Sequence, residues 1–201
     1  MKAIFCLVAA SLACGTALAD TPWLFKAGIS QVQPASNNGT LNTALGSFDA
    51  KVSDEVGLTP AIEYTFAPNL SAELLLAIPY KHDVELNGTK LANFKHLPPT
   101  VTLKYSGPEM SGFTPYVGAG LNYTFVYDEN IDVAGVTLKG DDSAGFAGLI
   151  GVNYKLPNSP LGAALDVRYI NIESDLTLNG TAIGKLKVNP WVIGLSLSYD
   201  Y

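Results

Sequence analysis

Charged residues and cysteines are scarce in this chain of 201 residues, and each scarcity narrows the class of protein. Only 15% of the residues are charged, whereas about 25% is typical of globular domains, and 48% are apolar. The 12 Lys and Arg are outnumbered by 18 Asp and Glu, and the net charge of −6 argues against a nucleic-acid partner. The apolar content excludes a disordered chain, and the length predicts a single domain.

Both cysteines, Cys6 and Cys14, lie in the first nineteen residues, which have the pattern of a cleaved secretory signal peptide. A positively charged start and an apolar run over residues 3–13 precede the small-x-small cleavage site Ala17-Leu18-Ala19. The alternative is a lipoprotein with its lipid on Cys14. Cleavage after residue 19 removes Lys2 as the only charged residue, which leaves a domain of residues 20–201 with 11 basic and 18 acidic residues. That domain has no cysteine for a disulfide or a metal site.

Residues 20–201 also lack any run of 18 apolar residues, which excludes a membrane-spanning helix. Apolar and polar residues instead alternate with a period of two, which predicts β-strands. Eight segments show this alternation: 23–30, 56–66, 70–80, 101–105, 113–125, 144–154, 161–169 and 191–201.

The connections between these segments alternate between short and long. Three are short and rich in Pro, Gly, Asn and Ser, at residues 67–69, 106–112 and 156–160. Four are long, at about residues 33–55, 83–97, 128–143 and 171–187. An even number of strands with tight turns at one end is typical of outer-membrane barrels. The sequence therefore predicts an all-β fold, an eight-stranded antiparallel transmembrane β-barrel with short periplasmic turns and four long extracellular loops.

The two faces of the predicted strands differ in chemistry. One face is large and apolar and is expected to meet lipid, with aromatic residues near the strand ends that form girdles. These aromatic residues are Trp23, Phe25, Tyr64, Phe66, Tyr123, Phe125, Trp191, Tyr199 and Tyr201. The other face is small and polar, and it carries a predicted lumen charge network of Lys26, Glu63, Glu73, Lys104, Asp166 and Arg168. We interpret these six residues as a plug, because the interior of an eight-stranded barrel is just wide enough for side chains to fill. A selective conduit is the alternative.

A soluble periplasmic barrel around one small ligand is a further alternative. It would turn the apolar face inward. Phe, Tyr, Trp and Leu side chains from every strand would then leave no cavity, and the small, Gly-rich face would meet water. This arrangement is therefore disfavoured.

Several blocks of the chain are similar to recognisable blocks of one known family, and they occur in that family's order. They are Lys26-Ala27-Gly28 with Val32 and Pro34, the stretch 64–79 with Glu73-Leu74-Leu75, His96-Leu97-Pro98-Pro99-Thr100, the stretch 115–123, and Asn189-Pro190-Trp191-Val192. In these blocks the chain resembles the OmpW family. The resemblance implies a barrel in the outer membrane of a Gram-negative cell, surrounded by outer-membrane lipid and lipopolysaccharide, and associated with passage of small hydrophobic solutes.

The last residue departs from that family's pattern. The family usually ends in Phe, whereas this chain ends in Tyr201. An aromatic carboxyl terminus still suits recognition by the barrel assembly machinery, which is therefore an expected partner.

Three prolines indicate where solute could leave the barrel. Proline lacks the N–H that a strand ladder needs. Pro79 lies near the outer end of one predicted strand, and Pro98 and Pro99 open the next. We expect strand pairing to fail there and to give a lateral opening, with Leu75, Phe94 and Leu97 as candidates to line the route. The alternative is that the prolines only terminate strands.

The remaining polar residues suggest no enzyme. His82 and His96 flank a long loop and could meet across it as metal ligands or as a base, but no nucleophile-elbow, HExxH or phosphate-loop motif accompanies them. We interpret them as solvated loop residues, and we expect no catalytic residue, metal or cofactor. The third long loop is acidic, with Asp128, Glu129, Asp132, Asp141 and Asp142, and could attract cations near lipopolysaccharide. The alternative function is a sealed structural barrel whose loops act as adhesin or receptor.

Overall fold

The computed structural model describes residues 22–44, 46–131, 133 and 135–201. The predicted signal peptide, residues 1–19, lies outside the described residues. Within the described ranges no helix is long and apolar enough to cross a membrane.

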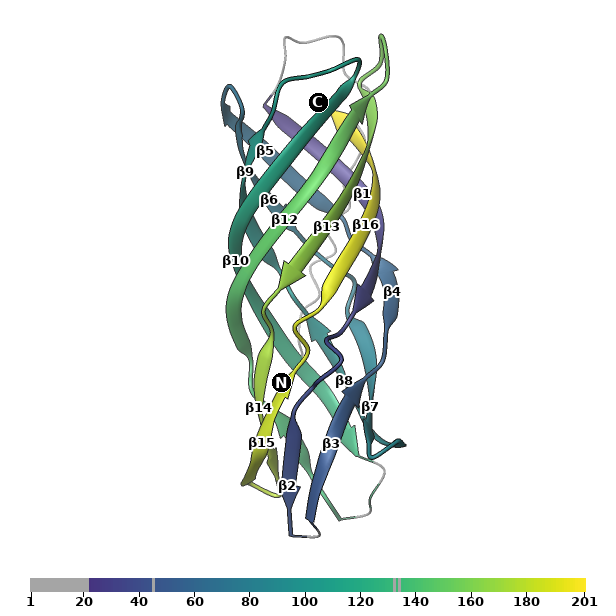
Figure 1. The fold of residues 1–201 in the computed structure, drawn as a ribbon, viewed down its shortest axis with the longest axis vertical. Helices are drawn as coiled ribbons and strands as arrows, with labels where there is room; N and C mark the ends of the chain where they lie inside the picture. Colours follow the sequence, from purple (N-terminus) through teal and green to yellow (C-terminus); the bar gives the residue numbers. More distant parts are fainter. Residues whose placement is uncertain (1–21, 45, 132, 134) are drawn as a thin grey trace, which may run out of the picture.

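Eight antiparallel strands close into a barrel, which confirms the predicted fold class (Figure 1). In spatial order they are β12 (Ser143–Lys155), β13 (Leu161–Ile170), β16 (Trp191–Asp200), β1 (Trp23–Gln33), β5 (Ala61–Ala67), β6 (Leu70–Leu75), β9 (Thr100–Ser106) and β10 (Phe113–Ile131). The ring closes where β10 pairs with β12, from Phe113↔Tyr154 to Thr124↔Ser143. Closure leaves the wall without a free sheet edge, so its backbone polar groups can be satisfied inside a bilayer.

The long connections differ from the prediction, because they contain strands of their own. These are β2 (Thr40–Thr43), β3 (Gly46–Val52), β4 (Glu55–Leu58), β7 (Tyr80–Leu86), β8 (Thr89–Leu97), β11 (Leu138–Gly140), β14 (Glu173–Leu178) and β15 (Thr181–Lys187). All but β4, together with the outer end of β10, form a structure that continues away from the barrel, in the lower half of Figure 1. We call this part the extension.

Asn-Gly turns explain two of the hairpins in the extension. Asn87 and Gly88 have φ angles of 48° and 81°, and Asn179 and Gly180 have φ angles of 49° and 80°. A two-residue type I′ turn requires positive φ at both positions, which Asn-Gly adopts readily. These turns join β7 to β8 and β14 to β15.

Two predicted strands are also interrupted. The segment predicted at 56–66 is divided by Thr59 and Pro60 into β4 and β5, although β1 pairs with both in one continuous register. The segment predicted at 70–80 ends as β6 at Leu75, and β7 begins at Tyr80. The interruption after Leu75 is important for the site described below.

The outer surface of the barrel carries the apolar face, as the alternation predicted. Large apolar side chains such as Leu121, Leu197 and Ile150 are exposed there. Aromatic contacts mark two levels, with Trp23–Tyr64 and Phe113–Tyr154 near the short turns, and Tyr123–Phe125 and Tyr169–Trp191 near the extension. An apolar band between two aromatic girdles is the surface that a bilayer requires.

Candidate functional site

Glutamates and lysines meet in the centre of the barrel. Glu63 of β5 and Glu73 of β6 lie directly opposite each other on neighbouring strands. Without counter-charges, their two carboxylates would repel each other. Lys26 Nζ lies 2.7 Å from a carboxylate oxygen of each glutamate. Lys104 Nζ lies 2.7 Å from Glu63 and 3.3 Å from Glu73. Two lysines therefore neutralise two glutamates, and all four side chains are buried.

Arg168 extends this network across the lumen. Its guanidinium contacts Glu73 at 2.7 Å and Asp166 at 2.6 Å. The centroid of the Tyr116 ring lies 3.9 Å from Lys104 Nζ. The cavity beside Lys26, Asp166 and Arg168 measures only about 10 Å³, about one water molecule. The structure thus brings all six residues of the predicted lumen charge network together, and all six are buried.

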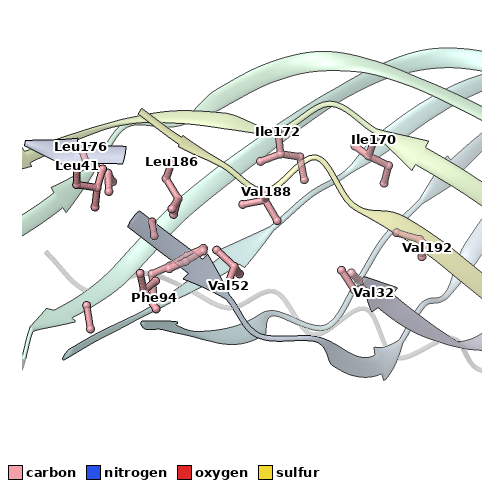
Figure 2. Packing of buried hydrophobic residues seen from close by; sticks show 14 of the residues in the cluster. Val32, Leu41, Val52, Phe94, Ile170, Ile172, Leu176, Leu186, Val188 and Val192 are labelled. Atoms are coloured by element: carbon pink, nitrogen blue, oxygen red, sulfur yellow. The ribbon is translucent and has the colours of Figure 1, made fainter. Parts of the chain in front are cut away.

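The interior of the extension is apolar instead. Side chains from β2, β3, β8, β14 and β15 point inward and pack on one another (Figure 2). A cavity of about 60 Å³ lies among them, and we call it the outer cavity. Its walls include Leu41, Val84, Phe94, Leu176, Leu186 and Val188.

A second, smaller cavity lies on the barrel side of the first. This inner cavity measures about 20 Å³ and is lined by Val32, Leu75, Ala77, Pro98 and Ile170, among others. His96 and Ile172 line both cavities and therefore lie at their junction. The apolar interior thus leads from the extension toward Leu75, one inward position along β6 from Glu73 of the charge network.

The barrel wall loses its pairing beside the inner cavity. β6 and β9 pair as far as Leu75↔Thr100, and pairing resumes at Tyr80↔His96 between β7 and β8. Four residues, 76–79, therefore face three residues, 97–99, with a shift of register. Within the described ranges no backbone hydrogen bond joins these two segments, although Leu76 N–H and Ile78 N–H donate to the other neighbour at Pro60 and Leu58. We call this interval the strand gap.

The predicted path residues lie around the strand gap in two groups. Leu75 and Pro98 line the inner cavity, and Phe94 lines the outer cavity. Pro79, Leu97 and Pro99 lie in the strand gap, are half-buried and line neither cavity. Leu97 is registered opposite Phe125, whose side chain is exposed on the outer face. Residues of the inward face and residues of the outward face of the barrel wall therefore both border the strand gap.

The interpretation of the two histidines as solvated loop residues is wrong. The exposed fractions of His82 and His96 are 0% and 1%, and their Nε2 atoms lie 3.0 Å apart. The Nδ1 atom of His82 lies 2.8 Å from the carbonyl oxygen of Ser53. Both histidines share the inward parity of Val84, Ala92 and Phe94 on β7 and β8. That alternation is a signal in the sequence that a loop assignment overlooks.

Because the two histidines are buried, their contribution to the stability of the fold depends on pH. Burial lowers the pKa of both imidazoles, that of His96 to about 3, because the charged ring loses its hydration. For His82, the hydrogen bond to Ser53 and the carboxylates of Glu55, Asp54 and Asp83 offset part of this effect. The unfolded chain binds a proton near pH 6.5, so the histidines' contribution to stability is complete above that pH and is lost below it.

We expect acidification to loosen the extension before the barrel. Between pH 7.5 and pH 5.5, His96 alone should lower the free energy of opening by about 1.4 kcal/mol, since the unfolded state gains a proton over one pH unit below 6.5. Amide hydrogen exchange of β7 and β8 at the two pH values measures this loss. A variant with His82→Phe and His96→Phe should show a smaller change, and an equal change would contradict the assignment to these histidines.

Two carboxylates of the acidic third long loop have partners within the chain. Asp128 pairs with Lys95 at 3.0 Å, and Asp142 accepts hydrogen bonds from Tyr123 and the backbone of Val126. Asp132 lies outside the described residues. No group of three or more His, Cys, Asp or Glu that could hold a metal occurs in the part of the chain that the structure describes.

A closed antiparallel barrel with an apolar belt, two aromatic girdles and a short-turn end is an outer-membrane β-barrel. The chain belongs to the OmpW family, whose sequence model matches residues 21–201, and it is located in the outer membrane. Outer membrane protein W of Vibrio cholerae is 34% identical, over 89% of this chain and 88% of that relative. Outer membrane protein AlkL of Ectopseudomonas oleovorans is 26% identical, over 89% and 82%. The crystal structure of OprG from Pseudomonas aeruginosa has a TM-score of 0.77 at 30% identity, and the match covers 89% of this chain and 95% of OprG.

Proposed function

We propose that this barrel passively admits small hydrophobic molecules through the outer membrane by a lateral route. One observation carries the proposal: the apolar interior ends at a charge-filled lumen, and the strand gap lies beside that end. The solute would enter the extension, reach the inner cavity and leave sideways through the wall.

The apolar cavities support the first step. Lipopolysaccharide presents a charged, hydrated layer that small hydrophobic molecules cross poorly. The walls of the outer and inner cavities are mostly aliphatic, with Phe94 as the aromatic member. Burial of apolar surface is favourable by about 25 cal/mol per Å², so a hydrophobic solute gains free energy by entering.

The lumen charge network supports the second step, in which the solute turns from the barrel axis toward the wall. An apolar solute that moved on toward the periplasm would have to separate Lys26, Glu73 and Arg168 in a nearly water-free space. Buried ions left without partners cost several kcal/mol, and an apolar molecule offers them no replacement contact. The axial route is therefore closed to this class of solute.

The strand gap supports the exit. Pro98 and Pro99 have no N–H to donate, and the N–H groups of Leu76 and Ile78 already bond on their other side. Separation of the two segments at this point breaks no backbone hydrogen bond within the described ranges. The gap lies at the level of Tyr123, whose N–H donates to the Pro99 carbonyl in the outer girdle. Exit there delivers the solute to the outer leaflet.

The test is uptake of a labelled apolar solute by cells with and without the protein, at matched outer-membrane integrity. A protein-dependent rise in the rate of entry is the expected result. Equal rates for several apolar solutes would overturn the proposal. That outcome would favour a sealed barrel whose extracellular part acts as adhesin or receptor.

A further inference from the structure

The small cavity beside Lys26, Asp166 and Arg168 adjoins the inner cavity. Thr59 and Leu75 line both cavities and therefore lie at their junction. We call the cavity at the charge network the polar cavity, because charged residues and hydroxyl-bearing residues border it. An apolar cavity of about 20 Å³ and a polar cavity of about 10 Å³ thus share a wall at Thr59.

The polar cavity has room for one oxygen atom and offers it hydrogen bonds. Its volume corresponds to about one water molecule. Arg168 borders it and is 4% exposed, and the buried Nη1 atom of Arg168 has no hydrogen-bond partner among the described residues. The hydroxyl oxygens of Ser30 and Thr59 lie 2.7 Å apart, and since one hydroxyl donates to the other, the accepting hydroxyl keeps its own proton to donate. These donors require an acceptor oxygen as their complement.

The charges around the polar cavity favour a neutral group over an ion. The cations and the carboxylates of the lumen charge network are equal in number and balance one another. A carboxylate group on a solute would add an uncompensated charge to a buried site, and it has two oxygens where there is room for about one. A hydrocarbon, in turn, would offer the donors no acceptor. The matching group is the oxygen of a carbonyl or a hydroxyl.

We propose that the inner and polar cavities together form a binding site for small neutral molecules with an apolar body and one carbonyl or hydroxyl oxygen. The apolar body lies among Val32, Ile170 and Val192 of the inner cavity (Figure 2). The oxygen reaches past Thr59 into the polar cavity. The inference rests on the proposed function, which brings the solute to the inner cavity. Among hydrophobic solutes, those with such an oxygen are bound beside the strand gap more tightly than hydrocarbons of the same shape.

Cyclohexanone and methylenecyclohexane test this inference, because they differ only by a carbonyl oxygen in place of a methylene carbon. Cyclohexanone is added to the native protein in lipid vesicles, and its carbonyl stretching band is recorded in the infrared. The band should gain a protein-dependent component at lower frequency, because hydrogen bonds from Arg168 and a hydroxyl weaken the C=O bond. The ketone concentration at which this component is half-saturated measures the affinity of the site.

Thr59→Val removes the hydroxyl at the junction and keeps the shape of the side chain. It should raise the half-saturating concentration about two- to tenfold, the equivalent of about one hydrogen bond. The matched control is Thr124→Val, which also removes a buried hydroxyl with one side-chain hydrogen bond, 2.7 Å to Asn122. Thr124 lines neither cavity, so this control should leave the half-saturating concentration unchanged.

A second variant fills the polar cavity without removing a polar group. Gly194 lines this cavity, and a methyl group there would lie 3.1 Å from Ser30 Oγ and 3.4 Å from Asp166 Oδ1. Gly194→Ala should therefore abolish the protein-dependent component. The matched control is Gly148→Ala, because the nearest atom of another strand to a methyl group there is the Gly118 carbonyl oxygen at 4.0 Å.

Two infrared results would overturn the inference while leaving the conduit intact. Absence of the component with the native chain would mean that the polar cavity holds water only, and an undiminished component in either folded variant would place the ketone elsewhere. If neither variant folds, the side-chain nitrogen resonances of Arg168 in bilayers decide: cyclohexanone should shift them more than methylenecyclohexane, and no such difference overturns the inference. Absence of protein-dependent entry of both solutes into vesicles, by contrast, contradicts the proposed function itself.

Discussion

Replacement of Glu73 by Ala is expected to lower the free energy of unfolding by about 3–5 kcal/mol, the usual cost of removing one partner from a buried ion pair. Glu73 is the common partner of Lys26, Lys104 and Arg168. Without it, three cations share two remaining carboxylates inside the barrel. The loss should therefore exceed that of any single exposed ion pair.

Urea unfolding in lipid vesicles, followed by tryptophan fluorescence, measures this loss. Asp200→Ala is the matched control, because Asp200 pairs with Lys155 at 3.0 Å on the exposed surface and such pairs contribute at most about 1 kcal/mol. A second variant, Glu73→Gln with Lys104→Met, restores neutrality and should recover part of the stability. A loss below about 1 kcal/mol for Glu73→Ala would show that the network is not a buried, mutually dependent unit.

Replacement of Ala77 by Trp is expected to reduce uptake of an apolar solute by about 5- to 150-fold. Ala77 is 8% exposed and faces the inner cavity, which has about 20 Å³ of free space. The indole would fill this cavity, and a solute would have to displace it from a packed wall at a cost of about 1–3 kcal/mol. Each 1.4 kcal/mol corresponds to a factor of ten.

The neighbouring residue supplies the control for that experiment. Leu76 belongs to the same segment but faces outward, with 37% of its surface exposed. Leu76→Trp should therefore leave uptake close to the native rate at equal amounts of folded protein. Equal loss in both variants would point to a general effect on folding, and no loss with Ala77→Trp would exclude the inner cavity from the path.

The alternation of apolar and polar residues was sufficient to predict the barrel. In β10 the exposed residues Val117 and Leu121 alternate with inward-facing positions. The same alternation in the other strands predicts that Lys26, Glu73 and Arg168 face the lumen, where they are buried. This works because a strand in a barrel has only two faces, and a charge on the lipid-facing one costs about 2–4 kcal/mol at the bilayer midplane. The fold and the composition of the network follow from local pattern alone.

The extension could not be predicted in the same way. Its side chains are apolar on the inward face and polar outside, but the inward face of β7 and β8 is covered by β2, β14 and β15 from distant parts of the chain. Only the Asn87-Gly88 and Asn179-Gly180 turns signalled hairpins locally. Burial of His82 and His96 depends on this long-range cover, whereas the alternation along β7 and β8 indicates only which face they share. The register shift at the strand gap is likewise a property of strand pairing, and three prolines indicate only its neighbourhood.

Lateral exit through the strand gap, as proposed above, requires that the two segments at the gap remain unpaired, and replacement of the prolines there tests this requirement. Pro79→Thr, Pro98→Thr and Pro99→Val together restore three N–H groups at residues that can pair. The matched control is Pro115→Thr in β10, a strand proline at the other end of the barrel. Uptake of a labelled apolar solute should fall toward the protein-free rate in the triple variant and stay near the native rate in the control. Undiminished uptake in a folded triple variant would contradict the lateral route.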